Sequence, residues 1–185
     1  MASALLRVRQ GLPADAGRLA ALGIQVWLHT YATAGISSAL ADYVLREFTQ
    51  QKFLGILSRQ AASVLVAEVK AHLVGYALVS GDTPCPARSS CQTELATLYV
   101  QEHFIGKGVG SALLAEAEDY CDTRAAGPMW VAVNAANQRA IAFYARHGYQ
   151  RIGSSLFELG GTGHENHVLI GPPARQRAAA RMHEI

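Results

Sequence analysis

This 185-residue chain has little excess charge of either sign, no long apolar run and no paired cysteines. Each of these absences excludes a class of protein. Lys and Arg total 16 against 14 Asp and Glu, and a formal net charge of +2 is too small for an electrostatic nucleic-acid binder. No stretch approaches the roughly 18 consecutive apolar residues of a membrane-spanning helix, and the N-terminus lacks the apolar core of a signal peptide. We therefore expect a cytoplasmic protein that binds neither nucleic acid nor a membrane.

The cysteines predict neither a disulfide framework nor a metal site. Cys85, Cys91 and Cys121 are odd in number and form no Cys-x-x-Cys pair, so reduced thiols are expected, with a Cys85–Cys91 bridge as the alternative. His164 and His167 resemble a metal pair only superficially, because residues three apart on a strand face opposite sides. The sequence predicts no metal.

Size and composition predict one globular domain. Hydrophobic residues make up 50% of the chain and charged residues 16%, which excludes a disordered protein. At this length a fold buries roughly 70% of the surface of the unfolded chain, so a core needs no disulfide or metal. We expect the domain to span residues 1–171, followed by a flexible tail at 172–185 that begins at Pro172.

Hydrophobic periodicity predicts strands and helices that alternate along the chain. Helices are expected at about 13–31, 38–58, 108–124 and 137–147. Strands are expected at 6–10, 62–68, 72–80, 93–100, 128–134, 149–159 and 165–170, with a Gly-rich turn at Gly160–Gly163 between the last two. This order indicates an α/β domain with a mixed sheet.

Residues 98–114 carry the most informative pattern, because an apolar strand ends at Val100 and a helix follows Gly106, Gly108 and Gly110. Small residues let the backbone close on an anion, and a helix N-terminus offers free N–H donors and a positive dipole end. The pattern predicts a phosphate or pyrophosphate site, with tight helix packing as the alternative. It fits neither the Walker A turn, which needs Gly-Lys-Ser/Thr, nor the Rossmann turn.

The same segment resembles motif A of the GNAT superfamily of acyl-CoA-dependent N-acetyltransferases, whose core reads Arg/Gln-x-x-Gly-x-Gly/Ala. Ile105 stands at the Arg/Gln position, which removes a side-chain contact to phosphate and leaves the backbone donors. Residues 130–149 resemble motif B, with these residues in register: Val133, Asn137, Ala140, Phe143, Tyr144, Gly148 and Tyr149. The resemblance implies a single-domain α/β fold, with a mixed, mostly antiparallel sheet of about seven strands flanked by about four helices and splayed at the acetyl-CoA site.

The resemblance also implies roles for individual residues, with acetyl-CoA as co-substrate. It assigns coenzyme binding to Leu98, Tyr99, Val100, Ile105, Gly106, Lys107, Gly108, Val109, Gly110, Ser111, Asn137 and Phe143. Tyr144 would be the general acid that protonates the leaving thiolate, the alternative being a core tyrosine. Glu94 would accept the amine proton through a water or hold a cationic substrate, unless it is a surface residue, and Glu102 is its rival.

On the acceptor side, Trp27 and Tyr31 lie one helical turn apart and would box an amine by cation–π contact, unless Trp27 is a core residue. Residues 94–100 and 157–160 resemble the bacterial polyamine acetyltransferase-like branch, although Asn134 replaces a tryptophan of that branch. The resemblance therefore implies an N-acetyltransferase for a primary amine of a small polyamine-like molecule or a peptide. A non-catalytic acyl-CoA-binding sensor on the same fold is the alternative. Homodimers are common in the superfamily, so a homodimer is the assembly to test for.

Overall fold

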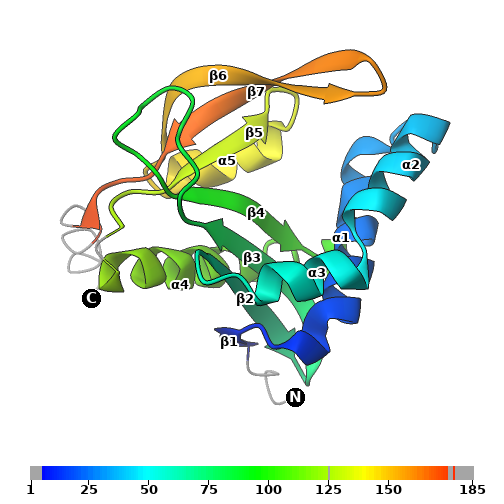
Figure 1. Ribbon diagram of the computed structural model, residues 1–185, viewed down its shortest axis with the longest axis horizontal. Coiled ribbons are helices and arrows are strands. Elements are labelled where there is room, and N and C mark those ends of the chain that lie inside the picture. The colour runs from blue at the N-terminus through cyan, green and yellow to red at the C-terminus, as the bar shows by residue number, and fades with distance from the viewer. Residues whose placement is uncertain (1–5, 125, 175–176, 178–185) are drawn as a thin grey trace. The chain divides into compact units, whose positions relative to one another are not determined.

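The chain forms an α/β fold in a computed structural model that describes residues 6–124, 126–174 and 177. Over these residues there are five α-helices and seven strands, with the sheet order β1-β2-β3-β4-β5-β7-β6 (Figure 1). The fold divides into two compact units, which are residues 1–79 with 97–117 and residues 80–96 with 118–185. The predicted mixed, mostly antiparallel sheet is confirmed, and each unit is described in turn.

The first unit holds the N-terminal half of the chain and the start of the helix after the Gly-rich turn. Its elements are β1 (Leu6–Gln10), the 3-10 helix η1 (Pro13–Asp15), α1 (Ala16–Tyr31), α2 (Ser38–Glu47), α3 (Gln50–Leu57), β2 (Ala62–Val69), β3 (His72–Ser80), part of β4 (Glu94–Val100), η2 (Glu102–Phe104) and part of α4 (Val109–Thr123). Strand β1 pairs antiparallel with β2, with Val8 opposite Ala67.

The core of the first unit is an apolar stripe of α1 packed with α3, β2 and β3. Leu19 and Leu22 of α1 are three residues apart and therefore lie on one helix face. They belong to one cluster with Phe53 of α3, Val66 of β2 and Tyr76 of β3. Burial of this stripe fixes α1 along the sheet and thereby places the last turn of α1.

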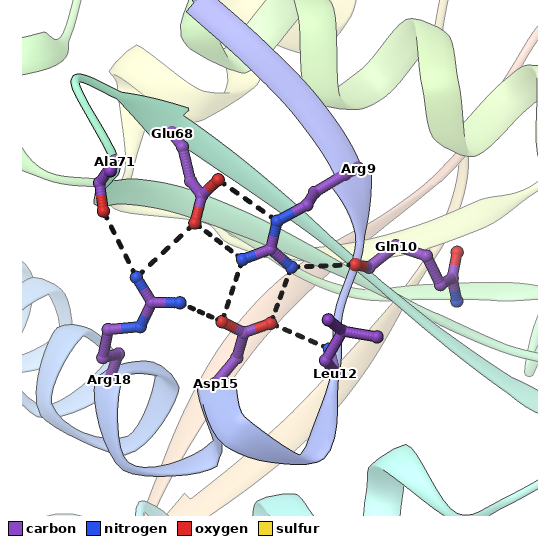
Figure 2. Close-up of polar contacts among 7 residues, drawn as sticks. All are labelled: Arg9, Gln10, Leu12, Asp15, Arg18, Glu68 and Ala71. Atoms are coloured by element: carbon purple, nitrogen blue, oxygen red, sulfur yellow. Dashed lines mark hydrogen bonds and ion pairs between the residues drawn. The ribbon is translucent and has the colours of Figure 1, made fainter.

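A network of four charged side chains joins β1, η1, α1 and β2 (Figure 2). The Arg9 guanidinium lies between two carboxylates, 2.7 Å from Asp15 Oδ2 and 2.6 Å from Glu68 Oε1. Arg18 also contacts both acids. Asp15 is 1% exposed and accepts a further hydrogen bond of 2.8 Å from the Leu12 N–H. The buried carboxylate is thus surrounded by donors from three segments of the chain.

The helix expected at about 38–58 is two helices, so the described chain has five helices where about four were expected. The break lies at Phe48 and Thr49, whose backbones leave the helical region. The Thr49 hydroxyl accepts a hydrogen bond from the Lys52 N–H and so caps α3. The apolar spacing of this segment continues through the break, which is why periodicity alone missed it.

The second unit is built on β5 (Trp130–Asn134), α5 (Gln138–Arg146), β6 (Gln150–Leu159) and β7 (Thr162–Ile170), with the remaining parts of β4 and α4. Strand β7 pairs antiparallel with both β5 and β6. The β6–β7 turn is Gly160–Gly161, and it is shorter than the predicted Gly160–Gly163 because Thr162 and Gly163 already pair with β6. Figure 1 shows β6 and β7 as a long two-stranded ribbon.

Residues 175, 176 and 178–185 of the predicted tail lie outside the described residues. Arg177 is described, and its side chain lies 3.7 Å from Glu118 Oε2 and also pairs with Asp122. Within the described parts of the chain, no helix is both long and apolar enough to cross a membrane.

Candidate active site

The turn between β4 and α4 presents an open backbone. Gly106 and Gly108 have φ angles of 76° and 81°, a region that L side chains rarely adopt, and a Cβ at either position would meet no atom within 4 Å. The Ala112 N–H bonds the Gly108 carbonyl at 3.0 Å, so Val109 and Gly110 provide N–H groups that precede the first intrahelical bond. Open space, exposed donors and the positive helix end fit a phosphate group.

The side chains of this turn add one positive charge. Lys107 Nζ lies 5.3 Å from the centroid of the Phe104 ring, a cation–π contact that holds the ammonium at the turn. Ile105 is apolar and 36% exposed, so it offers phosphate no hydrogen bond. Ser111 lies in the first turn of α4 and is exposed. Backbone donors and Lys107 are therefore the groups available to a pyrophosphate.

The last residues of β4 lead into this turn and pack closely against β3. A Cβ on Gly75 would lie 2.8 Å from the Tyr99 carbonyl oxygen, so only glycine permits this approach. The Gln101 N–H donates to the Val74 carbonyl at 2.9 Å, which fixes the end of the strand. The parallel register of β4 with β5 consists of Glu94 opposite Trp130 and does not use the backbone of residues 98–100. The backbone groups of residues 98–100 that do not pair with β3 are suited to an extended ligand arm.

Aromatic rings of α1 and α2 form a contact cluster in the first unit. The Trp27 ring lies 4.7 Å from Tyr31 and stacks on Tyr43 at 4.6 Å between centroids. Trp27 is 5% exposed and Tyr31 is 39% exposed. Because Trp27 and Tyr31 touch, no ammonium fits between them, and the predicted two-sided box is replaced by one accessible ring, that of Tyr31. Sequence reasoning did not single out Tyr43, whose contact with Trp27 depends on how α1 and α2 pack.

A second contact missed by sequence reasoning joins the last turns of α1 to the segment after β4. His29 Nε2 lies 3.3 Å from Glu102 Oε1, and Gln101 Nε2 donates to Gln25 Oε1 at 3.1 Å. Glu102 was expected to be a solvated rival of Glu94. The structure leaves it 57% exposed but pairs it with an imidazole.

Glu94 is a half-buried carboxylate at the first residue of β4, in the second unit. Burial raises the pKa of Glu94 above its ordinary value. Among the described residues, no hydrogen bond or ion pair stabilises its charge. Because no described group neutralises it, this carboxylate can accept a proton or bind a cation.

The motif B residues form the aromatic part of the second unit. Tyr144 is 5% exposed, and its ring lies 5.2 Å from Phe143 and 5.3 Å from Tyr149. Burial raises the pKa of Tyr144 well above its ordinary value, so the phenol keeps its proton at neutral pH. No hydrogen bond joins the Tyr144 hydroxyl to another described residue. The Asn137 side chain accepts from the Ala140 N–H at 3.0 Å and so caps α5.

His164 and His167 pair with Phe157 and Ser154 on β6, and the part of the chain that is described holds no group of three or more His, Cys, Asp or Glu arranged for a metal ion. Cys85, Cys91 and Cys121 are all buried and free.

Comparison with known proteins decides the family. Residues 24–149 match the profile of the Acetyltransferase (GNAT) family, a span that contains the Gly-rich turn, Glu94 and Tyr144. The chain belongs to the GNAT acetyltransferase family. It is therefore an acetyl-CoA-dependent acyltransferase.

Curated relatives and solved structures agree with this assignment. An uncharacterized N-acetyltransferase of Mycobacterium tuberculosis is 30% identical over 161 residues, which cover 84% of this chain and 96% of the relative. A PaiA N-acetyltransferase from Thermoplasma acidophilum, solved in complex with coenzyme A, superposes with a TM-score of 0.71 at 18% identity over 90% of this chain and 98% of its own. A ribosomal-protein-alanine N-acetyltransferase from Brucella melitensis gives a TM-score of 0.67 at 23% identity, covering 89% and 98% of the two chains. At these identities the two solved structures show the fold alone.

Proposed function

We propose that this GNAT enzyme transfers the acetyl group of acetyl-CoA directly to a primary amine of a small polyamine-like molecule or of a peptide. The observation that carries the proposal is Glu94, a half-buried carboxylate with a raised pKa and no partner among the described residues. An amine acceptor is an ammonium ion in water, and a lone carboxylate either takes its proton or holds its charge.

Tyr144 is the proposed general acid. Its buried phenol remains protonated at neutral pH, and its hydroxyl is not engaged by another described residue, so the proton is available to a leaving thiolate. All three cysteines are buried and lie outside the two motifs, which supports direct transfer rather than an acetyl-cysteine intermediate. A cytoplasmic location and a homodimer remain predictions from the sequence.

The first experiment measures thiol release from acetyl-CoA with a chromogenic thiol reagent. The acceptors are polyamines, amino acids, aminoglycosides, and peptides with a free N-terminus or lysine. Turnover on one class establishes the amine reaction and names the acceptor. Coenzyme binding without turnover on any acceptor contradicts the proposal and favours the sensor alternative.

Variants then assign the two residues. Tyr144→Phe is expected to lower kcat by about 100-fold or more, the lower end of general acid–base effects, with coenzyme affinity unchanged. Tyr149→Phe is the matched control, because its buried hydroxyl donates to Glu118 at 3.4 Å instead of standing unpaired. An unaltered kcat in Tyr144→Phe removes Tyr144 as the acid.

Glu94→Gln separates the two roles of the carboxylate. Loss of a charge holder raises KM for the amine with kcat preserved, whereas loss of a base lowers kcat. Glu165→Gln, an exposed residue paired with Arg151, is the control and is expected to change neither constant. If Glu94→Gln also changes neither, Glu94 has no part in the reaction.

A further inference from the structure

Two side-chain contacts join the C-terminal end of α1 to the segment that follows β4. Neither contact has a role in the reaction proposed above. Gln25 and His29 are one turn apart on the same helix face, and Gln101 and Glu102 follow directly after Val100. The Gln25–Gln101 hydrogen bond of 3.1 Å and the His29–Glu102 approach of 3.3 Å therefore act side by side. Together they place the imidazole of His29 over the segment that leads into the phosphate-binding turn.

The His29 imidazole is held by a contact with Glu102 and is accessible to solvent. The side chains of His29 and Glu102 are 44% and 57% exposed, and Tyr31 in the same helical turn is 39% exposed. Glu102 faces Nε2, which leaves Nδ1 for another group. Glu102 is the charged residue that the described structure places against His29, and the phenol of Tyr31, whose pKa is raised by burial, is a neutral neighbour at working pH.

This arrangement matches what deprotonation of an ammonium requires. An imidazole is the side chain whose ordinary pKa, about 6.5, allows it to accept a proton near neutral pH and to release it again. A carboxylate against one ring nitrogen orients the ring and stabilises the imidazolium that forms. Glu94, by contrast, has no partner among the described residues that would orient it.

We propose that His29 takes the proton from the acceptor ammonium and that Glu102 is its positioning residue, an inference that rests on the proposed acetylation of an amine. The proton passes from the substrate nitrogen to Nδ1 of His29, and the freed lone pair forms the C–N bond to the acetyl carbon. The tetrahedral adduct then gives its second nitrogen proton to water, the C–S bond breaks, and the thiolate takes a proton from the general acid. Exchange with water restores His29 and the acid, with one proton released for each acetyl group transferred.

The test is the pH dependence of kcat/KM for an amine that the wild-type enzyme acetylates. His29→Gln is expected to lower kcat/KM by at least 100-fold at neutral pH and to abolish the acid limb of the profile, with coenzyme affinity by calorimetry unchanged. Glu102→Gln is expected to lower kcat with KM for the amine and coenzyme affinity unchanged, because the ring loses the carboxylate that orients it. A purely structural role of Glu102 would not lower kcat alone. His103→Gln, an exposed histidine of the same turn, is the control, with a change of less than about twofold.

The outcomes separate this inference from the proposed function. A wild-type enzyme that acetylates no amine refutes the proposed function itself. An active wild type whose acid limb persists in His29→Gln, or whose loss is reproduced by His103→Gln, refutes the role of His29 alone. His29 and Glu102 are both half exposed, so both variants are expected to fold, and circular dichroism checks this.

Discussion

Asp15→Asn tests the charged network that anchors α1 to the sheet. The wild-type carboxylate is 1% exposed and accepts hydrogen bonds from Arg9, Arg18 and the Leu12 N–H (Figure 2). The hydrogen bonds from Arg9, followed by those from Leu12 and Arg18, outweigh burial and lower the pKa of Asp15 from 3.8 to about 2. An amide keeps the shape of the side chain but loses the charge, so the network loses one of the two carboxylates that neutralise Arg9 and Arg18.

The magnitude follows from the pKa shift. At 1.36 kcal/mol per unit, a shift from 3.8 to about 2 corresponds to about 2 kcal/mol of folding free energy. Because the folded pKa is the lower one, this stabilisation is fully present above the unfolded pKa of 3.8 and is lost as the pH falls through about 2. We expect Asp15→Asn to be less stable than wild type by about 2 kcal/mol at pH 7, with Glu68 left as a partner of Arg9 and Arg18.

The assay is urea unfolding followed by far-ultraviolet circular dichroism between pH 7 and pH 3. The part of the difference that comes from ionisation is expected to fall to about half at pH 3. Glu47→Gln is the control, because Glu47 pairs with Arg46 and Lys52 on the surface, where such pairs contribute roughly 0–1 kcal/mol. A difference for Asp15→Asn that stays below about 0.5 kcal/mol, or that does not narrow with falling pH, refutes the reasoning.

Three further predictions concern the turn, the strand pair and the thiols. Gly108→Val forces a left-handed φ of 81° on a branched residue and places methyl groups in the open space of the turn, so coenzyme affinity measured by calorimetry is expected to fall at least about tenfold. Gly75→Ala sets a Cβ 2.8 Å from the Tyr99 carbonyl oxygen and is expected to cost about 1–3 kcal/mol in urea unfolding; a neutral result would mean that the strands move apart freely. Burial raises the pKa of Cys91 and raises that of Cys121 to about 11, so a thiol reagent at pH 8 is expected to find no reactive cysteine in the native enzyme and all three after denaturation.

Many of the helices and strands can be predicted from local sequence patterns. The strand at Leu6–Gln10 and the helix that ends at Tyr31 were predicted within a residue or two, because alternation and a proline at a helix start are properties of neighbouring residues. The helix break at Thr49 was missed, since the apolar face continues past it and the cap depends on one hydroxyl. Which strands become neighbours depends on contacts between distant segments, and the order β5-β7-β6 came from the structure.

The candidate site also has features that the sequence predicts and features that only the structure shows. The Gly-rich turn and the residues around Tyr144 are contiguous motifs, so the sequence by itself indicated the family and predicted the anion-binding turn and the candidate acid. Only the tertiary structure decided that Glu102 faces His29 and that Trp27 is covered by Tyr43, because each contact depends on where packing of the core sets α1. A helix N-terminus carries its donors wherever it lies, whereas a proton acceptor acquires its partner only when two distant segments meet.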